Sequence, residues 1–130
     1  MASVPGDLKF TKTHEWVRID GDVATIGITD HAQAELGDIT YLDLPEPGSA
    51  LRPDAQFGEV ESVKAVSELF APVSGEVLES NISISDTTEV VNEDPYGAGW
   101  LIKVRLSDPS ELSSLMDAAD YEKFADGGGH

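Results

Sequence analysis

Short runs that alternate apolar and polar residues recur along this 130-residue chain, and turn-forming residues separate them. In the clearest run every second residue is apolar, and these residues are Trp100, Ile102, Val104 and Leu106. Such alternation is typical of a strand with one buried face. Short strands at regular spacing, with turns between them, predict a mainly β fold such as a small barrel or sandwich.

The remaining patterns give an expected order of elements. Strands are predicted over residues 14–19, 23–28, 39–44, 57–63, 66–71, 76–79 and 100–106. A helix is predicted over 30–36, because Thr29 suits its N-cap and Gly37 its C-terminal end. Residues 81–92 fit neither period, and 92–99 are dense in turn formers. Two short helices, over 107–116 and 117–124, are expected to close the chain.

Composition limits the classes of function. The chain has 25 acidic and 8 basic side chains, for a formal net charge of −17. Nucleic-acid binding is not expected, because a phosphate backbone needs a basic face. No apolar run is long enough to span a membrane. With no cysteine and three scattered histidines, the sequence predicts no metal site, and it shows no signature of a phosphate loop or nucleophile elbow.

The ends of the chain give expectations about domain organisation and location. A length of 130 residues suits one domain with its own core. We expect residues 1–126 to form this domain and residues 127–130 to form a disordered tail. Residues 1–7 contain neither an apolar segment nor an arginine, so they do not resemble a signal or transit peptide. This favours a bacterial cytoplasm, with the mitochondrial matrix as the alternative.

Lys64 is the most unusual charged residue. It is the only cation from residue 53 to residue 102, a stretch that contains ten carboxylates. Two strand-like runs flank it, and the small residues Ser62 and Ala65 leave its amine accessible. An exposed amine at a turn is well placed for acylation by another enzyme. This position suggests a carrier lysine that holds a mobile cofactor.

Specific motifs are spread along the chain and include His14-Glu15-Trp16. They occupy residues 13–17, 23–33, 44–48, 57–65, 72–77 and 91–100. With these motifs, residues 8–124 resemble the H proteins of the glycine cleavage system, which are lipoyl carriers. The resemblance implies a lipoyl-type or biotinyl-type hammerhead: two antiparallel sheets in a flattened barrel, with short helices that include a C-terminal helical segment.

The resemblance also implies a function centred on Lys64. Lipoate would be attached there as an amide and would shuttle the aminomethyl group of glycine. The implied partners are a pyridoxal-phosphate-dependent glycine decarboxylase, a tetrahydrofolate-dependent aminomethyltransferase, a dihydrolipoamide dehydrogenase, and a lipoate ligase or lipoyl transferase. The carrier itself would catalyse no reaction. By position, the resemblance further implies that Thr13, Glu15 and Glu68 line a cleft in which the loaded arm docks.

Other readings of Lys64 remain open at this stage. An H-like protein could instead relay lipoate to other proteins. A lipoyl domain of a 2-oxo acid dehydrogenase usually has Asp before the lysine, where this chain has Val63, and a biotin carrier has Met on both sides. An acidic interaction module with an unmodified Lys64 is a further alternative, which the intact mass of the native protein would test.

Overall fold

The structure, a computed structural model, describes residues 7–126, so the expected tail at 127–130 lies outside the described residues. Within this described range, nine strands form two sheets in which neighbouring strands are antiparallel. The larger sheet runs in the order β1 (Lys9–Phe10), β2 (Glu15–Asp20), β3 (Val23–Ile28), β9 (Ile102–Leu106), β8 (Gly75–Ser80) and β5 (Ala50–Leu51). The smaller sheet contains β4 (Ile39–Asp43), β6 (Gln56–Ser62) and β7 (Val66–Phe70).

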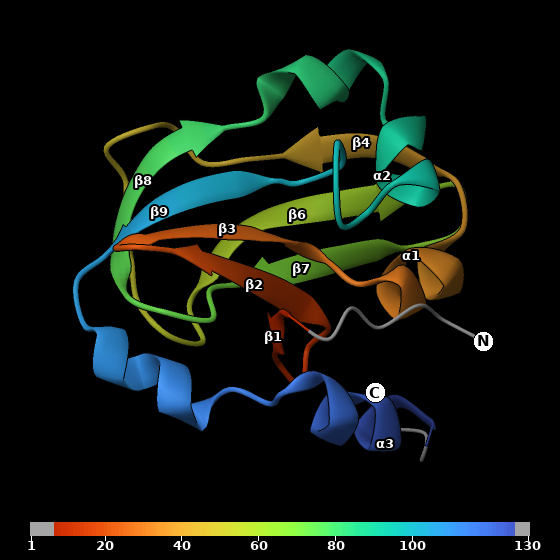
Figure 1. Cartoon of the computed structure of the whole chain (residues 1–130). Helices are drawn as coiled ribbons and strands as arrows, with labels where there is room; N and C mark the ends of the chain where they lie inside the picture. Colours follow the sequence, from red (N-terminus) through yellow and green to blue (C-terminus); the bar gives the residue numbers. More distant parts are fainter. Residues whose placement is uncertain (1–6, 127–130) are drawn as a thin grey trace.

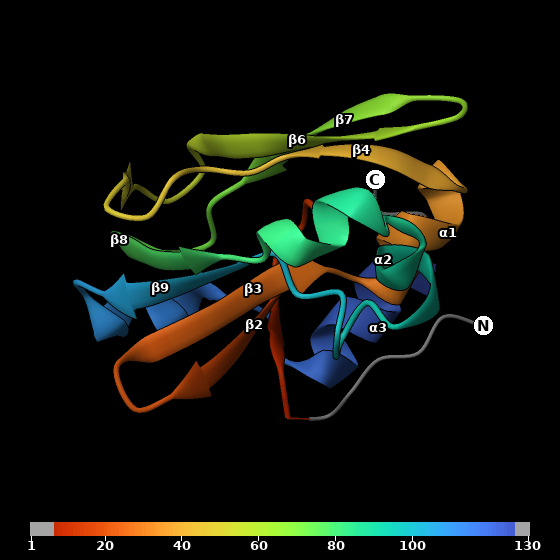
Figure 2. The same ribbon diagram turned by 90° about the horizontal axis from the view of Figure 1, so that it is seen from above.

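The two sheets form layers that enclose the main hydrophobic core (Figure 2). The alternation in β9 buries Ile102, Val104 and Leu106 in this core, as the sequence predicts. The prediction of a mainly β fold with two antiparallel sheets and short helices is therefore confirmed. Over the described residues the sheets remain separate layers, and no strand pairing closes them into a barrel.

In the part of the chain that the structure describes, five short helical segments connect or cover the sheets. They are α1 (Asp30–Leu36), the 3₁₀ helix η1 (Ile82–Asp86), α2 (Glu89–Glu93), the 3₁₀ helix η2 (Pro109–Ser114) and α3 (Ala118–Asp126). The bounds of α1 match the prediction, because the Thr29 hydroxyl accepts a hydrogen bond from Ala32 N at 3.2 Å. Gly37 ends this helix at a φ of 78°, a value that favours glycine.

The C-terminal helix α3 lies beside β1, at one edge of the larger sheet (Figure 1). A second hydrophobic cluster lies there, with the buried side chains Leu8, Phe10, Trp16 and Tyr121. The rings of Phe10 and Tyr121 stack with centroids 4.6 Å apart. Because Trp16 faces this cluster and Val17 faces the main core, β2 is apolar on both sides and α3 completes its burial.

The β6–β7 hairpin, which contains Lys64, ends beside α1 (Figures 1 and 2). The helix α1 and the β6–β7 hairpin each follow from short-range sequence signals, which are the caps of α1 and the alternating runs around Lys64. Their proximity is a tertiary result, and it determines the surroundings of the lysine.

Candidate functional site

Lys64 lies at the tip of the β6–β7 hairpin, and its side chain is exposed. Ser62 fixes the tip, since its hydroxyl accepts hydrogen bonds from Lys64 N at 3.3 Å and from Ala65 N at 3.1 Å. The backbone N–H of Ser62 also donates to Ala65 O at 2.8 Å. Within residues 7–126, Lys64 takes part in no ion pair. The lysine is thus an accessible amine on an ordered backbone.

The hairpin tip is also attached to the segment that follows α1. Val63 N donates to Asp38 O at 3.1 Å. A β-carbon added at Gly37 would lie 3.6 Å from Lys64 Cε, so the lysine stem passes close to this glycine. These contacts place the Lys64 side chain beside the C-terminal end of α1.

A groove of about 290 Å³ opens beside α1. Its lining residues come from the β1–β2 loop, α1 and β7, and they are Thr13, His14, His31, Ala32, Glu35, Leu36 and Ser67. Ala32 and Leu36 give it an apolar wall, and the remaining side chains are polar or ionisable. A groove of this kind suits an aliphatic chain that ends in a polar group.

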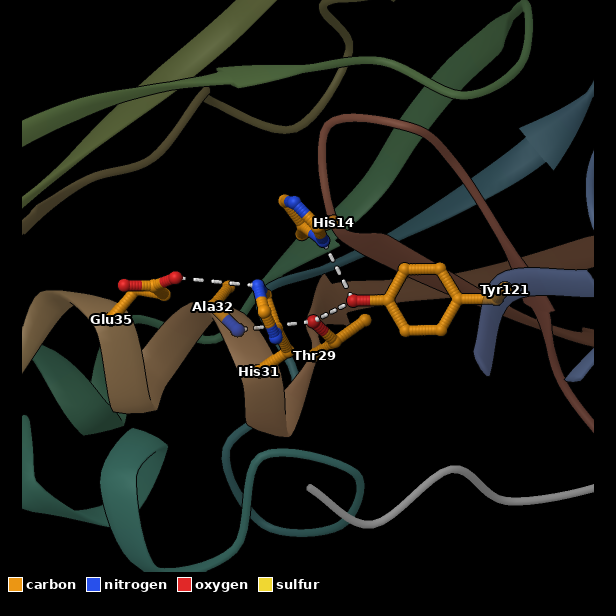
Figure 3. Close-up of polar contacts among 6 residues, drawn as sticks. All are labelled: His14, Thr29, His31, Ala32, Glu35 and Tyr121. Carbon is orange, nitrogen blue, oxygen red and sulfur yellow. Dashed lines mark hydrogen bonds and ion pairs between the residues drawn. The ribbon is translucent and has the colours of Figure 1, made fainter. Parts of the chain in front are cut away.

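A polar network supports the groove from the C-terminal helix (Figure 3). The Tyr121 hydroxyl lies 2.7 Å from His14 Nδ1 and 2.7 Å from Thr29 Oγ1. The imidazoles of His14 and His31 stack with centroids 4.6 Å apart. Burial raises the pKa of Tyr121 to about 12, so its hydroxyl keeps its proton at any physiological pH. The network therefore holds His14 in place without changing charge at Tyr121.

Glu15 is buried rather than exposed in the groove. Its side chain is 1% exposed, and its carboxyl oxygens accept hydrogen bonds from Thr11 Oγ1 at 2.6 Å, from Thr13 Oγ1, and from Phe70 N at 3.2 Å. Burial raises the pKa of Glu15 to about 7, although these hydrogen bonds act in the opposite direction. Glu15 thus joins the β1–β2 loop to the end of β7 and holds the groove residue Thr13.

Glu68 lies on the solvent face of the smaller sheet. It pairs with Glu59, which pairs in turn with Asp43, so three carboxylates follow one row across the sheet. The adjacent row, nearer the hairpin tip, contains Tyr41, Glu61 and Val66. We call these two rows the outer face of the smaller sheet.

Apolar side chains are also exposed near Lys64. Tyr41 is 53% exposed, Val66 is 60% exposed and Val63 is 72% exposed. Exposed apolar residues that adjoin a functional group often mark a surface for partner binding. The outer face therefore combines acidic and apolar groups next to the lysine.

Comparisons with known proteins identify the family. Residues 8–127 match the sequence profile described as glycine cleavage H-protein. The chain belongs to the glycine cleavage H-protein family. A glycine cleavage system H protein from Rubrobacter xylanophilus is 60% identical over 119 residues, which cover 92% of this chain and 94% of that protein. One from Symbiobacterium thermophilum is 51% identical over 124 residues, which cover 95% and 97%.

A solved structure supports the same assignment. The crystal structure of a glycine cleavage system H protein from Mycobacterium marinum matches with a TM-score of 0.86 and 38% sequence identity. The match covers 96% of this chain and 99% of that chain. H proteins are carrier components of a multienzyme system and are not themselves enzymes, so the groove does not have to be a catalytic site.

Two other kinds of feature are missing from the described part of this chain. Among the residues that the structure describes, no three His, Asp or Glu side chains are grouped so that they could hold a metal ion. In the same part of the chain, no helix is long and apolar enough to cross a membrane.

The site residues predicted from the sequence do not all lie together in the structure. Lys64 and Thr13 both belong to the region beside α1, whereas Glu15 is buried and Glu68 faces solvent on the outer face. Sequence reasoning missed Glu35, which lines the groove, because it resembles any surface acid in an acidic chain. No sequence signal indicates it, because the proximity of α1 to the β6–β7 hairpin is a tertiary result.

Proposed function

We propose that this chain is the lipoyl carrier of a glycine cleavage system, with lipoate joined as an amide to Lys64 Nζ. The exposed lysine at an ordered hairpin tip carries this proposal, together with family membership. When attached, lipoate supplies a redox-active disulfide on a long flexible arm, on which the aminomethyl group of glycine is carried. The protein then contributes proximity, because a tethered group reaches each enzyme at a high effective concentration.

The residues around Lys64 fit a lipoyl arm. The amine is free of ion pairs in the described part of the chain, so acylation removes no such contact. Gly37 leaves room for the lysine stem, and the adjacent groove has an apolar wall at Ala32 and Leu36. An aliphatic arm attached at Lys64 would have a surface to lie on.

Site-specific lipoylation tests this proposal. The apo-protein is incubated with a lipoate ligase, lipoate and ATP, and the product is examined by intact mass and peptide mapping. We expect one lipoyl group, on Lys64, and none on Lys64→Arg, which should fold normally because the side chain is exposed. A lipoyl group on Lys9, Lys12, Lys103 or Lys123 would contradict the assignment.

We further propose that the loaded arm docks in the groove beside α1. Thr13 lines this groove, and Glu15 contributes by holding the Thr13 hydroxyl. Glu68 follows Ser67, which lines the groove, and so lies near its edge. Thr13 would thus contact the arm, Glu15 would support that contact, and Glu68 would add negative charge at the edge of the groove.

The proposed partners are those of the glycine cleavage reaction. They are the pyridoxal-phosphate-dependent decarboxylase, the tetrahydrofolate-dependent aminomethyltransferase, the dihydrolipoamide dehydrogenase, and the enzyme that attaches lipoate. The acidic and apolar outer face adjoins Lys64, which supports docking of enzymes with basic surfaces there. Because the relatives come from bacteria, we propose that the carrier acts in a bacterial cytoplasm. Its scaffold would be of the hammerhead type.

A further inference from the structure

The short helix α2, which lies beside α1 and the start of β4 (Figure 1), carries an asparagine that binds both of these elements. Asn92 Oδ1 accepts a hydrogen bond from Ile39 N at 3.0 Å. Asn92 Nδ2 donates to Gly37 O at 2.8 Å and to Gln33 Oε1 at 2.9 Å. A backbone N–H only donates and a carbonyl only accepts, so these partners fix the orientation of the amide. Asn92 therefore closes the turn between α1 and β4.

A second side chain holds β4 at the same residue. The Thr88 hydroxyl donates to Ile39 O at 2.5 Å, so the N–H and the carbonyl of Ile39 both bind side chains of the segment 88–92. β4 is an edge strand of the smaller sheet, with β6 on one side. On its other side, at Ile39, these two side chains take the place of a strand partner. The start of β4 is therefore fixed by α2 as well as by the sheet.

The turn that Asn92 closes also holds the tip of the β6–β7 hairpin. The two backbone residues that Asn92 binds flank Asp38. Asp38 O accepts a hydrogen bond from Val63 N at 3.1 Å, and Val63 directly precedes Lys64. The Val63 side chain is 72% exposed, so its packing contributes little to holding the tip. Hydrogen bonds thus connect Asn92, through the turn at 37–39, to the residue before the lysine.

We propose that Asn92 is a positioning residue that sets where Lys64 is presented to the enzyme that attaches lipoate. This inference rests on the proposed carrier function. In the reaction with lipoyl adenylate, the neutral lysine amine attacks the carbonyl carbon and an amide bond forms. The C–O bond to AMP breaks, AMP leaves with the electron pair, and the nitrogen gives up a proton. The amine must be held close to the acyl carbon for this attack, and an ordered tip meets that need in advance.

Loss of the Asn92 contacts should affect recognition more than chemistry. When the turn at 37–39 loosens, the hairpin tip takes up other positions, and only a fraction of the folded carrier is competent to bind. The apparent affinity then falls in proportion to that fraction. The carrier that does bind is held in the same way as the wild type. We therefore expect KM for the carrier to rise while kcat stays nearly constant.

Asn92→Asp tests this role with little change in side-chain volume. The carboxylate still accepts from Ile39 N, but the oxygen that replaces Nδ2 faces two acceptors, Gly37 O and Gln33 Oε1, and donates to neither. Lipoylation is measured with a lipoate ligase, lipoate and ATP at several concentrations of apo-carrier. KM should rise about five- to tenfold, the effect of losing about one hydrogen bond, with kcat within about twofold of the wild type.

Asn81→Asp is the matched control. Asn81, at the end of β8, also uses its amide to bind two backbone carbonyls, Ala98 O at 3.1 Å and Trp100 O at 2.8 Å. The two substitutions change the net charge equally, and urea denaturation compares their effects on global stability. Asn81→Asp should destabilise the fold and leave KM near the wild-type value, because its contacts do not reach the hairpin tip.

Amide hydrogen exchange at Val63 reports the tip directly. We expect exchange about five- to tenfold faster in Asn92→Asp and unchanged in Asn81→Asp. If either aspartate variant does not fold, Asn92→Ala and Asn81→Ala give the same comparison. Equal KM values for the variants at 92 and 81, or a higher KM with no faster exchange at Val63, would overturn the role of Asn92 alone. If the wild type acquires no lipoyl group at Lys64, intact mass and peptide mapping will show it, and the carrier function is overturned as well.

Discussion

Glu15 shows how one buried side chain can organise a functional surface. Its carboxyl group is 1% exposed and joins the β1–β2 loop to β7 through Thr11, Thr13 and Phe70. When the group is protonated, its O–H can donate to a threonine hydroxyl while the other oxygen accepts from Phe70 N. Because the threonine hydroxyls can donate or accept, they satisfy either charge state. Burial, which disfavours the charged form, therefore has the larger effect and raises the pKa of Glu15 to about 7.

This pKa predicts a specific pH dependence of stability. Between about pH 4.5 and pH 7 the folded protein binds more protons at Glu15 than the unfolded chain does. The free energy of unfolding should therefore fall as pH rises, by about 3 kcal/mol at this residue. Glu15→Gln imitates the protonated form and should lack this component. Urea denaturation at several pH values measures it, and parallel pH profiles for the two proteins would refute the prediction.

At the scale of single residues, the sequence shows that Lys64 is isolated among acidic residues, but it does not show which side chains are buried. Lys64 was recognisable because no other cation lies between residues 53 and 102. Glu15 and Glu35 belong to a chain with 25 acidic residues, so neither differs from an ordinary surface acid by composition. Only the packing of the β1–β2 loop against β7, and of α1 against the hairpin, assigns them their positions.

Among the elements, the β6–β7 hairpin has a tip that is held by one side chain, Ser62. The Ser62 hydroxyl accepts hydrogen bonds from the backbone of Lys64 and Ala65. Ser62→Ala removes these bonds and should lower the free energy of unfolding by about 1 kcal/mol. Amide hydrogen exchange at Lys64 and Ala65 should become faster. Lipoylation should lose up to about fivefold in kcat/KM.

The control for this prediction is Ser62→Thr, which keeps the hydroxyl group. Its exchange rates at Lys64 and Ala65 should stay close to those of the wild type. If Ser62→Ala shows unchanged exchange and an unchanged rate of lipoylation, the strands alone order the hairpin tip.

The C-terminal helix should support the groove through Tyr121. Its hydroxyl contacts His14 and Thr29, and the side chain is fully buried. Tyr121→Phe should cost about 1–2 kcal/mol of stability, or about 5 °C in melting temperature. With the pKa of Tyr121 at about 12, the Tyr121 hydroxyl keeps its proton from pH 6 to pH 9, so its own ionisation should add no pH dependence to this loss. Calorimetry at several pH values gives the comparison.

Tyr41→Phe provides the matched control, because Tyr41 is 53% exposed. Its melting temperature should equal that of the wild type within experimental error. Similar losses for the two tyrosine variants would mean that the Tyr121 hydroxyl does not tie α3 to the groove.

The predictability of the elements follows from their local signals. The bounds of α1 are correct because its ends are set by Thr29 and Gly37, which act within the helix itself. The ambiguous region 81–92 contains η1 and most of α2, two segments of five residues that are too short to show a helical period. The strand predicted from residue 100 begins at Ile102, since Trp100 still belongs to the turn whose Gly97 O accepts its N–H. Strands β1 and β5 have two residues each and were not predicted.

For the whole molecule, charge should govern how quickly partners meet it. A net charge of −17 attracts enzymes with basic docking surfaces. Salt screens this attraction, with a Debye length of about 8 Å near physiological ionic strength. The apparent KM of the aminomethyltransferase for the carrier should therefore rise with ionic strength. Free lipoamide in the dehydrogenase assay is neutral and should show little dependence on salt.

The distribution of charge should matter in addition to its total. Glu59→Gln, Glu61→Gln and Glu68→Gln together remove the charge of three of the four carboxylates on the outer face beside Lys64. Asp117→Asn, Asp120→Asn and Glu122→Gln change the net charge equally at the start of α3. Asparagine caps a helix about as well as aspartate, so the side chain at position 117 should keep its hydrogen bond from the backbone N–H of residue 120. The first triple variant should lose more turnover. Equal losses would show that net charge alone steers the encounter.

The row of Asp43, Glu59 and Glu68 has a consequence for the carrier when it is not engaged. Like charges directly opposite one another on a sheet repel, so this row of carboxylates destabilises the free protein. A partner that places cations over the row reduces this repulsion when it binds. By linkage, each complex should then melt at a higher temperature than the carrier alone. The carrier would thus be more stable in its complexes with partner enzymes than as the free protein.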